Sequence, residues 1–305
     1  MAAARDANRH ATIAFAALLL GATGIGFAPI FVRIADVGPI SSAFWRMALA
    51  LPPLLLWRMI MRRHGDEGGR PFLRLAPPRD RRAALLLFAA GVFFAADLGL
   101  WHWSIKLTSV ANATLLANLN PIFVALAGFL FLGHRFRPPF LLAMALALGG
   151  AVVLMGRSVE IAPGRLLGDL LGVATAMMYA GYFLATAALR NRHDTWTVLF
   201  YSVLVTALVL GPLAVVSESD ILPANATGWA VVVALALVCQ IAGQGLIVHA
   251  LAHLPPAFSA LTLLLQPVVA ALAAWALFGE ALGGMEFLGA LLIFAGILLA
   301  RRTFA

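Results

Sequence analysis

Apolar stretches of about twenty residues recur almost from one end of the chain to the other, separated by short breaks that hold most of the charged residues. An α-helix rises 1.5 Å per residue, so about 20 residues cross a bilayer core of about 30 Å. The breaks leave ten segments near that length, at residues 11–34, 39–60, 83–105, 109–132, 138–156, 168–189, 195–216, 228–250, 257–278 and 284–300. The pattern predicts an all-α integral membrane protein with ten transmembrane helices.

The composition supports a membrane protein over a soluble one. Hydrophobic residues make up 63% of the chain and charged residues 11%, whereas soluble domains carry about 25% charged residues. The net charge of +8 does not indicate nucleic-acid binding, because the basic residues form short clusters between the apolar segments. Cys239 is the only cysteine, which excludes a disulfide framework or a cysteine metal site. We expect no cofactor and no bound metal.

The basic residues are divided unevenly between alternate breaks, and the positive-inside rule turns this into an orientation. One side receives Arg5, Arg9, the arginines from Arg58 to Arg82, Arg135, Arg137, Arg190, Arg192, Arg301 and Arg302, and the other only Arg33, Lys106, Arg157 and Arg165. We therefore expect both termini in the cytoplasm, in the inner (plasma) membrane, and a monomer surrounded by lipid. The long break at residues 61–82 is interpreted as an arm lying against anionic headgroups, with a partner-binding loop as the alternative.

An internal repeat is the strongest functional signal. Sliding the chain by 146 residues superposes Gly99 on Gly245, Pro121 on Pro267 and Gly133 on Gly279, among other matches. Each half (residues 1–157 and 158–305) then holds five spans, an odd number, so the second half must run upside down. Inverted repeats are typical of secondary transporters, whose site lies near the midplane between the halves and whose halves rock to give alternating access. A duplicated scaffold without transport is the alternative.

Ordered motifs give the chain a family resemblance that covers nearly its whole length. The motifs are Ala43-Phe44-Trp45-Arg46, then Ser109-Val110-Ala111-Asn112-Ala113 leading into Asn120-Pro121, and Leu265-Gln266-Pro267 followed by Phe278-Gly279-Glu280. With them the chain resembles the EamA-type exporters of the drug/metabolite transporter superfamily. The resemblance implies two five-helix repeats and export of amino acids or other small metabolites, and the family's aromatic amino acid exporters make that substrate class the first expectation. His134 departs from the pattern, because the family commonly has Glu there and Glu280 at the matching position of the second half.

Two charged residues lie deep within spans, and such residues usually face the bundle interior. Arg46 and Asp97 lie at similar depth, so we predict a buried ion pair or a shared hydrogen-bond network. A structural pair and a pair that contacts substrate remain open alternatives. Trp101 follows Asp97 by one helical turn and is a candidate for the cavity wall.

The remaining candidate substrate-binding residues are polar or aromatic side chains on spans three, four, six, eight and nine. They are His102, Lys106, Asn112, Asn120, Tyr179, Tyr182, Gln244, Thr262 and Gln266. The competing interpretations are a snorkelling loop lysine for Lys106, hydrogen bonds between helices for the amides, and core packing for the tyrosines. Pro121 and Pro267 are predicted kinks that loosen the preceding turn and expose carbonyl groups to a cavity.

A carrier fits this pattern better than the two alternatives. An integral-membrane enzyme acting on a lipid or small amphiphile would need a catalytic motif that the sequence lacks, and a channel would need charged rings or a filter-like loop. Few deep charges beside aromatic and amide side chains favour neutral or zwitterionic substrates over phosphates. We expect an exporter of small organic metabolites, most of all aromatic or other apolar amino acids, with drugs or other metabolites as the alternative.

Overall fold

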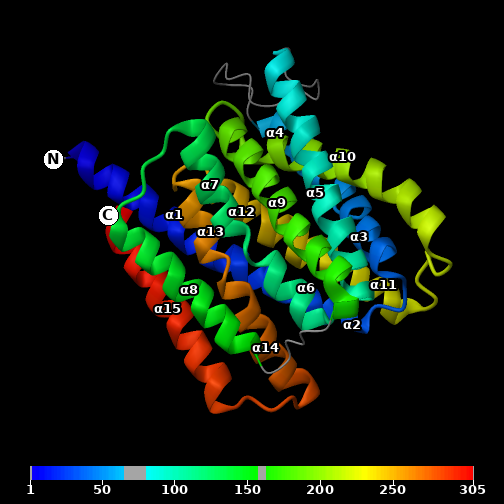
Figure 1. Cartoon of the computed structure of the whole chain (residues 1–305). Helices are drawn as coiled ribbons and strands as arrows, with labels where there is room; N and C mark the ends of the chain where they lie inside the picture. Colours follow the sequence, from blue (N-terminus) through cyan, green and yellow to red (C-terminus); the bar gives the residue numbers. More distant parts are fainter. Residues whose placement is uncertain (1, 65–79, 157–162, 305) are drawn as a thin grey trace.

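The computed structural model describes residues 2–64, 80–156 and 163–304. Within these ranges the chain is built from helices and contains no β-strand (Figure 1). In chain order they are α1 (Ala2–Gly26), α2 (Ala28–Ile34), α3 (Pro39–Ala48), α4 (Leu51–His64), α5 (Arg81–Leu107), α6 (Val110–Ala117), α7 (Asn120–Leu132), α8 (Pro138–Met155), the short η2 (Pro163–Arg165), α9 (Leu166–Arg190), α10 (Thr195–Ser217), α11 (Ala226–Ala234), the π-helix η3 (Leu235–Gln244), α12 (Gly245–Ala250), α13 (Pro256–Thr262), α14 (Leu265–Phe278) and α15 (Gly284–Phe304). Most of the predicted 61–82 loop and the predicted boundary between the halves fall outside the described residues.

Ten helical segments of the described chain are long and apolar enough to cross a membrane. These spans, numbered 1 to 10 below, are Arg9–Ile34, Pro39–Trp57, Arg81–Leu107, Asn112–Leu132, Pro138–Met155, Leu166–Arg190, Thr195–Ser217, Ala226–Ala250, Pro256–Phe278 and Gly284–Thr303. Each predicted segment overlaps one of them, so the predicted number and order of spans are confirmed. The bounds differ by a few residues.

Spans 4 and 9 are each interrupted near the middle of the bundle. In span 4 a short turn separates α6 from α7, and in span 9 a short turn separates α13 from α14. The second helix of each pair carries a proline in its first turn, Pro121 and Pro267. A proline there needs no N–H partner, whereas within a continuous helix its ring would clash with the carbonyl one turn earlier. The matching prolines of the repeat thus break the fourth helix of each half at the same place.

Matching glycines end the broken spans in the same way. Gly133 follows α7 with φ 66° and Gly279 follows α14 with φ 68°, and these are the only positive φ values in the described chain. The left-handed conformation is accessible to glycine without a Cβ clash, and it stops a helix while its N–H bonds back to the last turn. The same terminator at both repeat positions supports the inverted five-helix halves.

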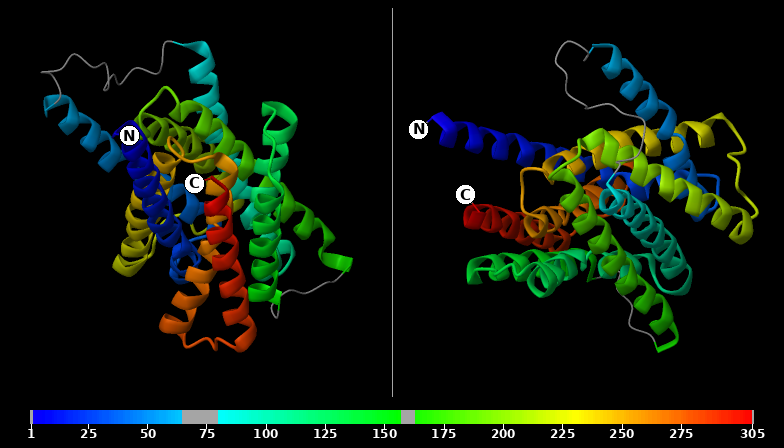
Figure 2. Two further views of the ribbon diagram at one scale, coloured as in Figure 1. Left: turned by 90° about the vertical axis from the view of Figure 1, so that its left-hand side faces the viewer. Right: turned by 90° about the horizontal axis from the view of Figure 1, so that it is seen from above.

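Spans 5 and 10 pack side by side, as α8 and α15 show in Figure 1 and in the right-hand view of Figure 2. Glycines make the close approach possible. A Cβ on Gly150 would lie 2.7 Å from the carbonyl oxygen of Gly289, and a Cβ on Gly296 would lie 2.7 Å from that of Ala143. Small residues at such crossings let helix backbones approach within lipid, where no hydrophobic force drives helices together.

The two ends of the chain lie at the same end of the bundle. The left-hand view of Figure 2 shows the start of α1 and the end of α15 at the top, and the turn between α14 and α15 at the bottom. This arrangement follows from an even number of spans. It leaves the cytoplasmic placement of the termini as a prediction.

One ion pair ties the halves together at the end remote from the termini. Arg33, near the end of α2, pairs with Glu280 just after α14, and its guanidinium carbon lies 4.2 Å from the centre of the Phe278 ring. The repeat position of Glu280 is His134, which packs edge-on against Phe136. Arg190, at the end of span 6, donates instead to the carbonyl oxygens of Val248 and His193. The connection is therefore ionic at one end of the bundle only, among the residues the structure describes.

Candidate functional site

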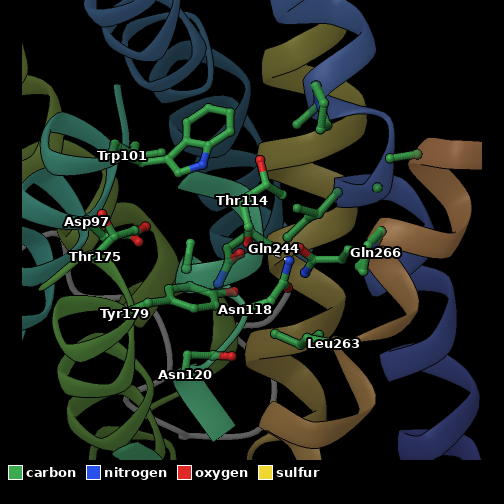
Figure 3. Close-up of a pocket in the computed structure, with 18 of the residues that line it drawn as sticks. Asp97, Trp101, Thr114, Asn118, Asn120, Thr175, Tyr179, Gln244, Leu263 and Gln266 are labelled. Atoms are coloured by element: carbon green, nitrogen blue, oxygen red, sulfur yellow. Dashed lines mark hydrogen bonds between the residues drawn. The ribbon is translucent and has the colours of Figure 1, made fainter. Parts of the chain in front are cut away.

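A cavity of about 160 Å³ lies between the two halves (Figure 3). It is lined by spans 1 to 4 of the first half and spans 6, 8 and 9 of the second. The lining residues are Ile25, Gly26, Ala28, Pro29, Arg46, Phe94, Asp97, Leu98, Trp101, Thr114, Ala117, Asn118, Asn120, Thr175, Tyr179, Gln244, Leu263, Gln266, Pro267 and Ala270. The cavity borders the breaks in spans 4 and 9, and it also borders the point in span 1 where α1 ends at Gly26 and α2 begins at Ala28.

The cavity occupies the middle of the bundle and the half away from the termini. Thr114 and Trp101 lie near the ends of their spans that face away from the termini, and Arg46 lies in the half of span 2 on the same side. The opposite half is filled by large buried side chains, including Leu18, Tyr182, Leu199, Ile247 and Phe258. The described structure is therefore closed on the side of the termini.

Arg46 and Asp97 face the same cavity without forming an ion pair. No contact within 4.0 Å joins them in the described chain, so the predicted direct pair is wrong for this conformation. The Arg46 Nε donates instead to the Gln240 Oε1 at 3.1 Å, because the π-helix of span 8 brings that amide against α3. Asp97 makes no hydrogen bond within the described residues, and its carboxylate points into the cavity (Figure 3). Arg46 and Asp97 thus line one cavity, and neither has an oppositely charged group within 4.0 Å among the described residues.

Three cavity-lining amides have polar atoms without a partner among the described residues. They are the Nδ2 of Asn120, the Oε1 of Gln244 and the Nε2 of Gln266. Asn120 and Gln266 are repeat mates, each placed just before the proline of its broken span. Buried polar atoms are nearly always hydrogen-bonded, and leaving one unpaired costs about 1–3 kcal/mol. The amides therefore offer both donors and an acceptor to a ligand.

Aromatic rings form one wall of the cavity. Tyr179 stacks parallel to Tyr182 with ring centres 6.0 Å apart, and Tyr182 stacks on Phe94 at 4.6 Å. Tyr179 and Phe94 line the cavity, and Trp101 adds a third ring from α5 (Figure 3). Tyr182 is fully buried behind them, where its hydroxyl accepts a hydrogen bond from the Gln244 Nε2 at 3.0 Å. It supports the wall without lining it.

The EamA-like transporter family matches the chain twice, at residues 12–156 and again at residues 166–302. The chain belongs to the EamA-like transporter family. It is thereby a multi-pass membrane protein of the drug/metabolite transporter superfamily, as the sequence motifs predict. The double match gives each five-span half of this transporter its own copy of the family sequence.

Several characterised or solved proteins resemble this EamA-like transporter. The pseudopaline exporter CntI of Pseudomonas aeruginosa is 27% identical over 225 residues, covering 73% of this chain and 77% of the relative. A probable terminal-alkyne amino-acid exporter of Streptantibioticus cattleyicolor is 25% identical over 292 residues, covering 95% and 89%. One crystal structure superposes with a TM-score of 0.79 at 20% identity, covering 97% of this chain and 98% of that one, which shows a shared fold.

Some predicted site residues lie away from the cavity of this EamA-like transporter. His102 is buried with its Nδ1 2.6 Å from the Leu98 carbonyl oxygen, and Lys106 is exposed at the end of α5. The Asn112 Nδ2 donates to the Asp169 carboxylate at 3.2 Å, and the Thr262 hydroxyl donates to the Phe258 carbonyl oxygen. Pro121 is buried beside the break in span 4. Of these residues, Asn112 joins spans 4 and 6, whereas the bonds of His102 and Thr262 stay within their own helices.

Other lining residues went unrecognised in the sequence. Thr114 lies on α6 and Asn118 directly follows that helix, and the Asn118 Nδ2 donates to the Thr114 carbonyl oxygen at 2.9 Å. Thr175 lies one turn before Tyr179 on α9. Thr175 could have been predicted, because it lies four residues before Tyr179 and therefore on the same helix face. Asn118 would have been found from its place two residues before Asn120.

Proposed function

We propose that this EamA-like transporter exports small zwitterionic metabolites, foremost aromatic or other apolar amino acids, by alternating access around the central cavity. One observation carries the proposal. Arg46 and Asp97 place opposite charges on a single cavity and do not neutralise each other by contact. A zwitterion supplies the missing counterion to both.

The electrostatic cost of the empty arrangement favours such a ligand. A charge removed from water is costly unless it is paired, and breaking a buried pair costs about 3–5 kcal/mol. An α-amino acid brings a carboxylate for the Arg46 guanidinium and an ammonium group for the Asp97 carboxylate. A phosphate ester would meet one cation and one repelling carboxylate, which makes it a poorer ligand.

The size and the rings of the cavity favour a small apolar or aromatic side chain. A dry protein cavity of about 150 Å³ is enough to hold a benzene molecule, and the cavity here measures about 160 Å³. Phe94, Trp101 and Tyr179 offer ring faces for stacking with another ring. The free amide atoms would bind the polar end of the same ligand.

The closed and open ends support transport by alternating access. The side of the termini is sealed, whereas the cavity extends into the other half of the bundle. With the termini in the cytoplasm, as the distribution of arginines predicts, this is an outward-facing conformation. Two relatives are named exporters, one of them for an amino acid, which supports outward movement.

Counterflow in proteoliposomes tests the proposal. Vesicles loaded with unlabelled phenylalanine should accumulate labelled phenylalanine, and the effect should saturate. Phenylpropionate lacks the ammonium group and phenethylamine lacks the carboxylate, so neither should replace phenylalanine inside the vesicles. Equal exchange of all three compounds, or exchange of an uncharged drug alone, would reject the amino-acid assignment.

The same vesicles separate a carrier from an enzyme. The recovered label is analysed by chromatography, and a carrier returns phenylalanine unchanged. Conversion of the label in detergent solution, without any compartment, would instead indicate an enzyme.

A further inference from the structure

A second hollow lies outside the transport cavity, between α7 and α8. It measures about 640 Å³ and is lined by Ile122, Ala125, Leu126, Phe129, Arg135, Phe136, Leu141 and Met144. Phe129 is 57% exposed and Leu126 is 48% exposed, so the groove opens on the outer surface of the bundle. Its walls are apolar apart from one cation, Arg135.

The connection between the two helices covers one end of the groove. Phe136 stacks on Phe140 with ring centres 5.2 Å apart, and His134 packs edge-on against it. A Cβ on Gly128 would lie 3.1 Å from the His134 Nδ1 and 3.6 Å from the Phe136 ring, so the glycine leaves room for this connection. The groove is thus a packed feature of the fold at the end of the bundle that carries the termini.

Arg135 lies exposed at the covered end and makes no ion pair among the described residues. The other lining residues extend from it into the membrane along α7 and α8. Ile122 and Phe129 are seven residues apart, about 10 Å along a helix. The groove therefore has a charged end at the membrane interface and an apolar length within the bilayer core.

The inverted repeat provides an internal comparison. The repeat positions of Arg135, Phe136 and Phe129 are Ala281, Leu282 and Trp275, at the opposite end of the bundle. The repeat positions of Phe129 and Phe136 are thus also apolar in the second half, whereas the repeat position of Arg135 carries no charge. The charge therefore belongs to one membrane face, the face that the positive-inside rule assigns to the cytoplasm and its anionic lipids.

We infer that this groove is a binding site for one anionic phospholipid, with its phosphate on Arg135 and an acyl chain along α7 and α8. Charge complementarity selects the headgroup, and the apolar walls take the chain. A bound peptide would need partners for its backbone N–H and C=O groups, which these walls lack. The site is separate from the cavity of Arg46 and Asp97, so it stands whether or not the transporter moves amino acids.

Native mass spectrometry of the purified full-length protein tests the site. The probe is an equal mixture of dioleoyl phosphatidylglycerol and dioleoyl phosphatidylcholine added to the delipidated protein. The wild type should retain one phosphatidylglycerol in preference to phosphatidylcholine. Arg135→Gln should reduce that preference about fivefold, since a basic residue near an anionic surface contributes about 1 kcal/mol. Arg302→Gln, an exposed arginine at the same end of the bundle, should leave it unchanged.

A variant that fills the groove tests binding of the acyl chain separately from binding of the lipid headgroup. Leu126→Trp should lower retention of both lipids, because the larger side chain occupies the space of the acyl chain. Three results would overturn the site: equal retention of the two lipids by the wild type, equal effects of Arg135→Gln and Arg302→Gln, or unchanged retention in Leu126→Trp. A dimer that Leu126→Trp converts to a monomer would show that a second copy of the chain occupies the groove, and would also reject the lipid.

Discussion

Arg46 and Asp97 were recognisable from sequence because a charge deep in an apolar segment has few explanations other than function. Their relationship was not recognisable. The Gln240 amide binds the Arg46 Nε, and its position depends on the π-helix of span 8. No local sequence pattern predicted that π-helix. The depth of a residue follows from counting along a helix, whereas the direction of its side chain depends on how neighbouring helices are wound.

Replacing the cavity carboxylate should remove most of the transport. Asp97→Asn keeps the size of the side chain and removes the charge that would bind an ammonium group. A hydrogen bond to a charged group is worth about 1.5–3 kcal/mol, so phenylalanine counterflow should fall about 10- to 100-fold at limiting substrate. The yield of folded protein should match that of Ser219→Ala, an exposed control position. Wild-type counterflow in Asp97→Asn would remove Asp97 from the site.

The aromatic wall gives a second prediction at this scale. Trp101→Ala removes one ring from the cavity and should weaken transport of phenylalanine more than that of alanine, because alanine has no ring to stack. Competition of unlabelled phenylalanine and alanine against labelled phenylalanine measures the two affinities. An equal loss for both amino acids would indicate that Trp101 acts only on packing.

At the scale of helices, the sequence predicted what length and hydropathy control, and missed what packing controls. The ten spans and the breaks near Pro121 and Pro267 follow from apolar length and from the missing proline N–H. The assignment of Asn112 and Thr262 to the cavity did not hold, although they share helix faces with Asn120 and Gln266. Asn112 lies more than one turn before the break in span 4 and donates to the Asp169 carboxylate. Thr262 adjoins the break in span 9, but it is fully buried and its hydroxyl donates to the Phe258 carbonyl oxygen.

The contact between spans 5 and 10 should depend on one of two neighbouring glycines. A Cβ on Gly150 would meet three atoms of α15 within 2.8 Å, whereas a Cβ on Gly149 would meet nothing within 4 Å. Gly150→Ala should destabilise the protein by about 1–3 kcal/mol through overpacking. Gly149→Ala should be neutral or stabilising by up to about 1 kcal/mol, from helix propensity. Thermal unfolding in detergent compares the two, and equal melting temperatures would show that the helices separate freely.

A histidine cluster at the end of the bundle that carries the termini predicts a dependence of stability on pH. The ring of His253 lies 5.4 Å from that of His249 and 6.0 Å from that of His10. Partial burial lowers the pKa of His253, and the positive charge of Arg190 lowers it further. The unfolded chain, with a histidine pKa of about 6.5, then binds protons more readily than the folded protein.

The melting temperature should therefore fall as the pH drops through about 6.5 towards the lower pKa of folded His253. His253→Gln should show a smaller fall over the same range, because glutamine does not titrate. Parallel curves for the two proteins would assign the pH dependence to other groups.

On the scale of the whole molecule, the inverted architecture was predictable because an odd number of spans in each half leaves no other arrangement. The conformation was not predictable, because the same sequence must adopt both the inward-open and the outward-open arrangement of an inverted repeat. In the described structure, the two sides differ in the size of the side chains that occupy them. Tyr182, Leu199 and Phe258 fill the side of the termini, and the smaller Thr114, Ala117 and Asn118 leave space on the other.

Accessibility of single cysteines should report this conformation. In a Cys239→Ala background, Asn118→Cys lines the cavity and Thr186→Cys lies in the sealed half. A membrane-impermeant maleimide added to intact cells should label Asn118→Cys and leave Thr186→Cys unlabelled, and saturating substrate should slow the labelling. If a membrane-permeant maleimide labelled Asn118→Cys and the impermeant reagent did not, the resting protein would instead open to the cytoplasm.

The ion pair of Arg33 and Glu280 has a consequence for the energetics of the transport cycle. Its repeat position holds His134, so the two resting orientations of the carrier differ in energy. An exposed pair is worth up to about 1 kcal/mol, which is about a fivefold bias in occupancy. Glu280→Gln should reduce that bias, which single-molecule distance measurements across the two ends of the cavity would show. The difference in energy between the two orientations then comes from Glu280, which has no acidic counterpart at position 134 of the first half.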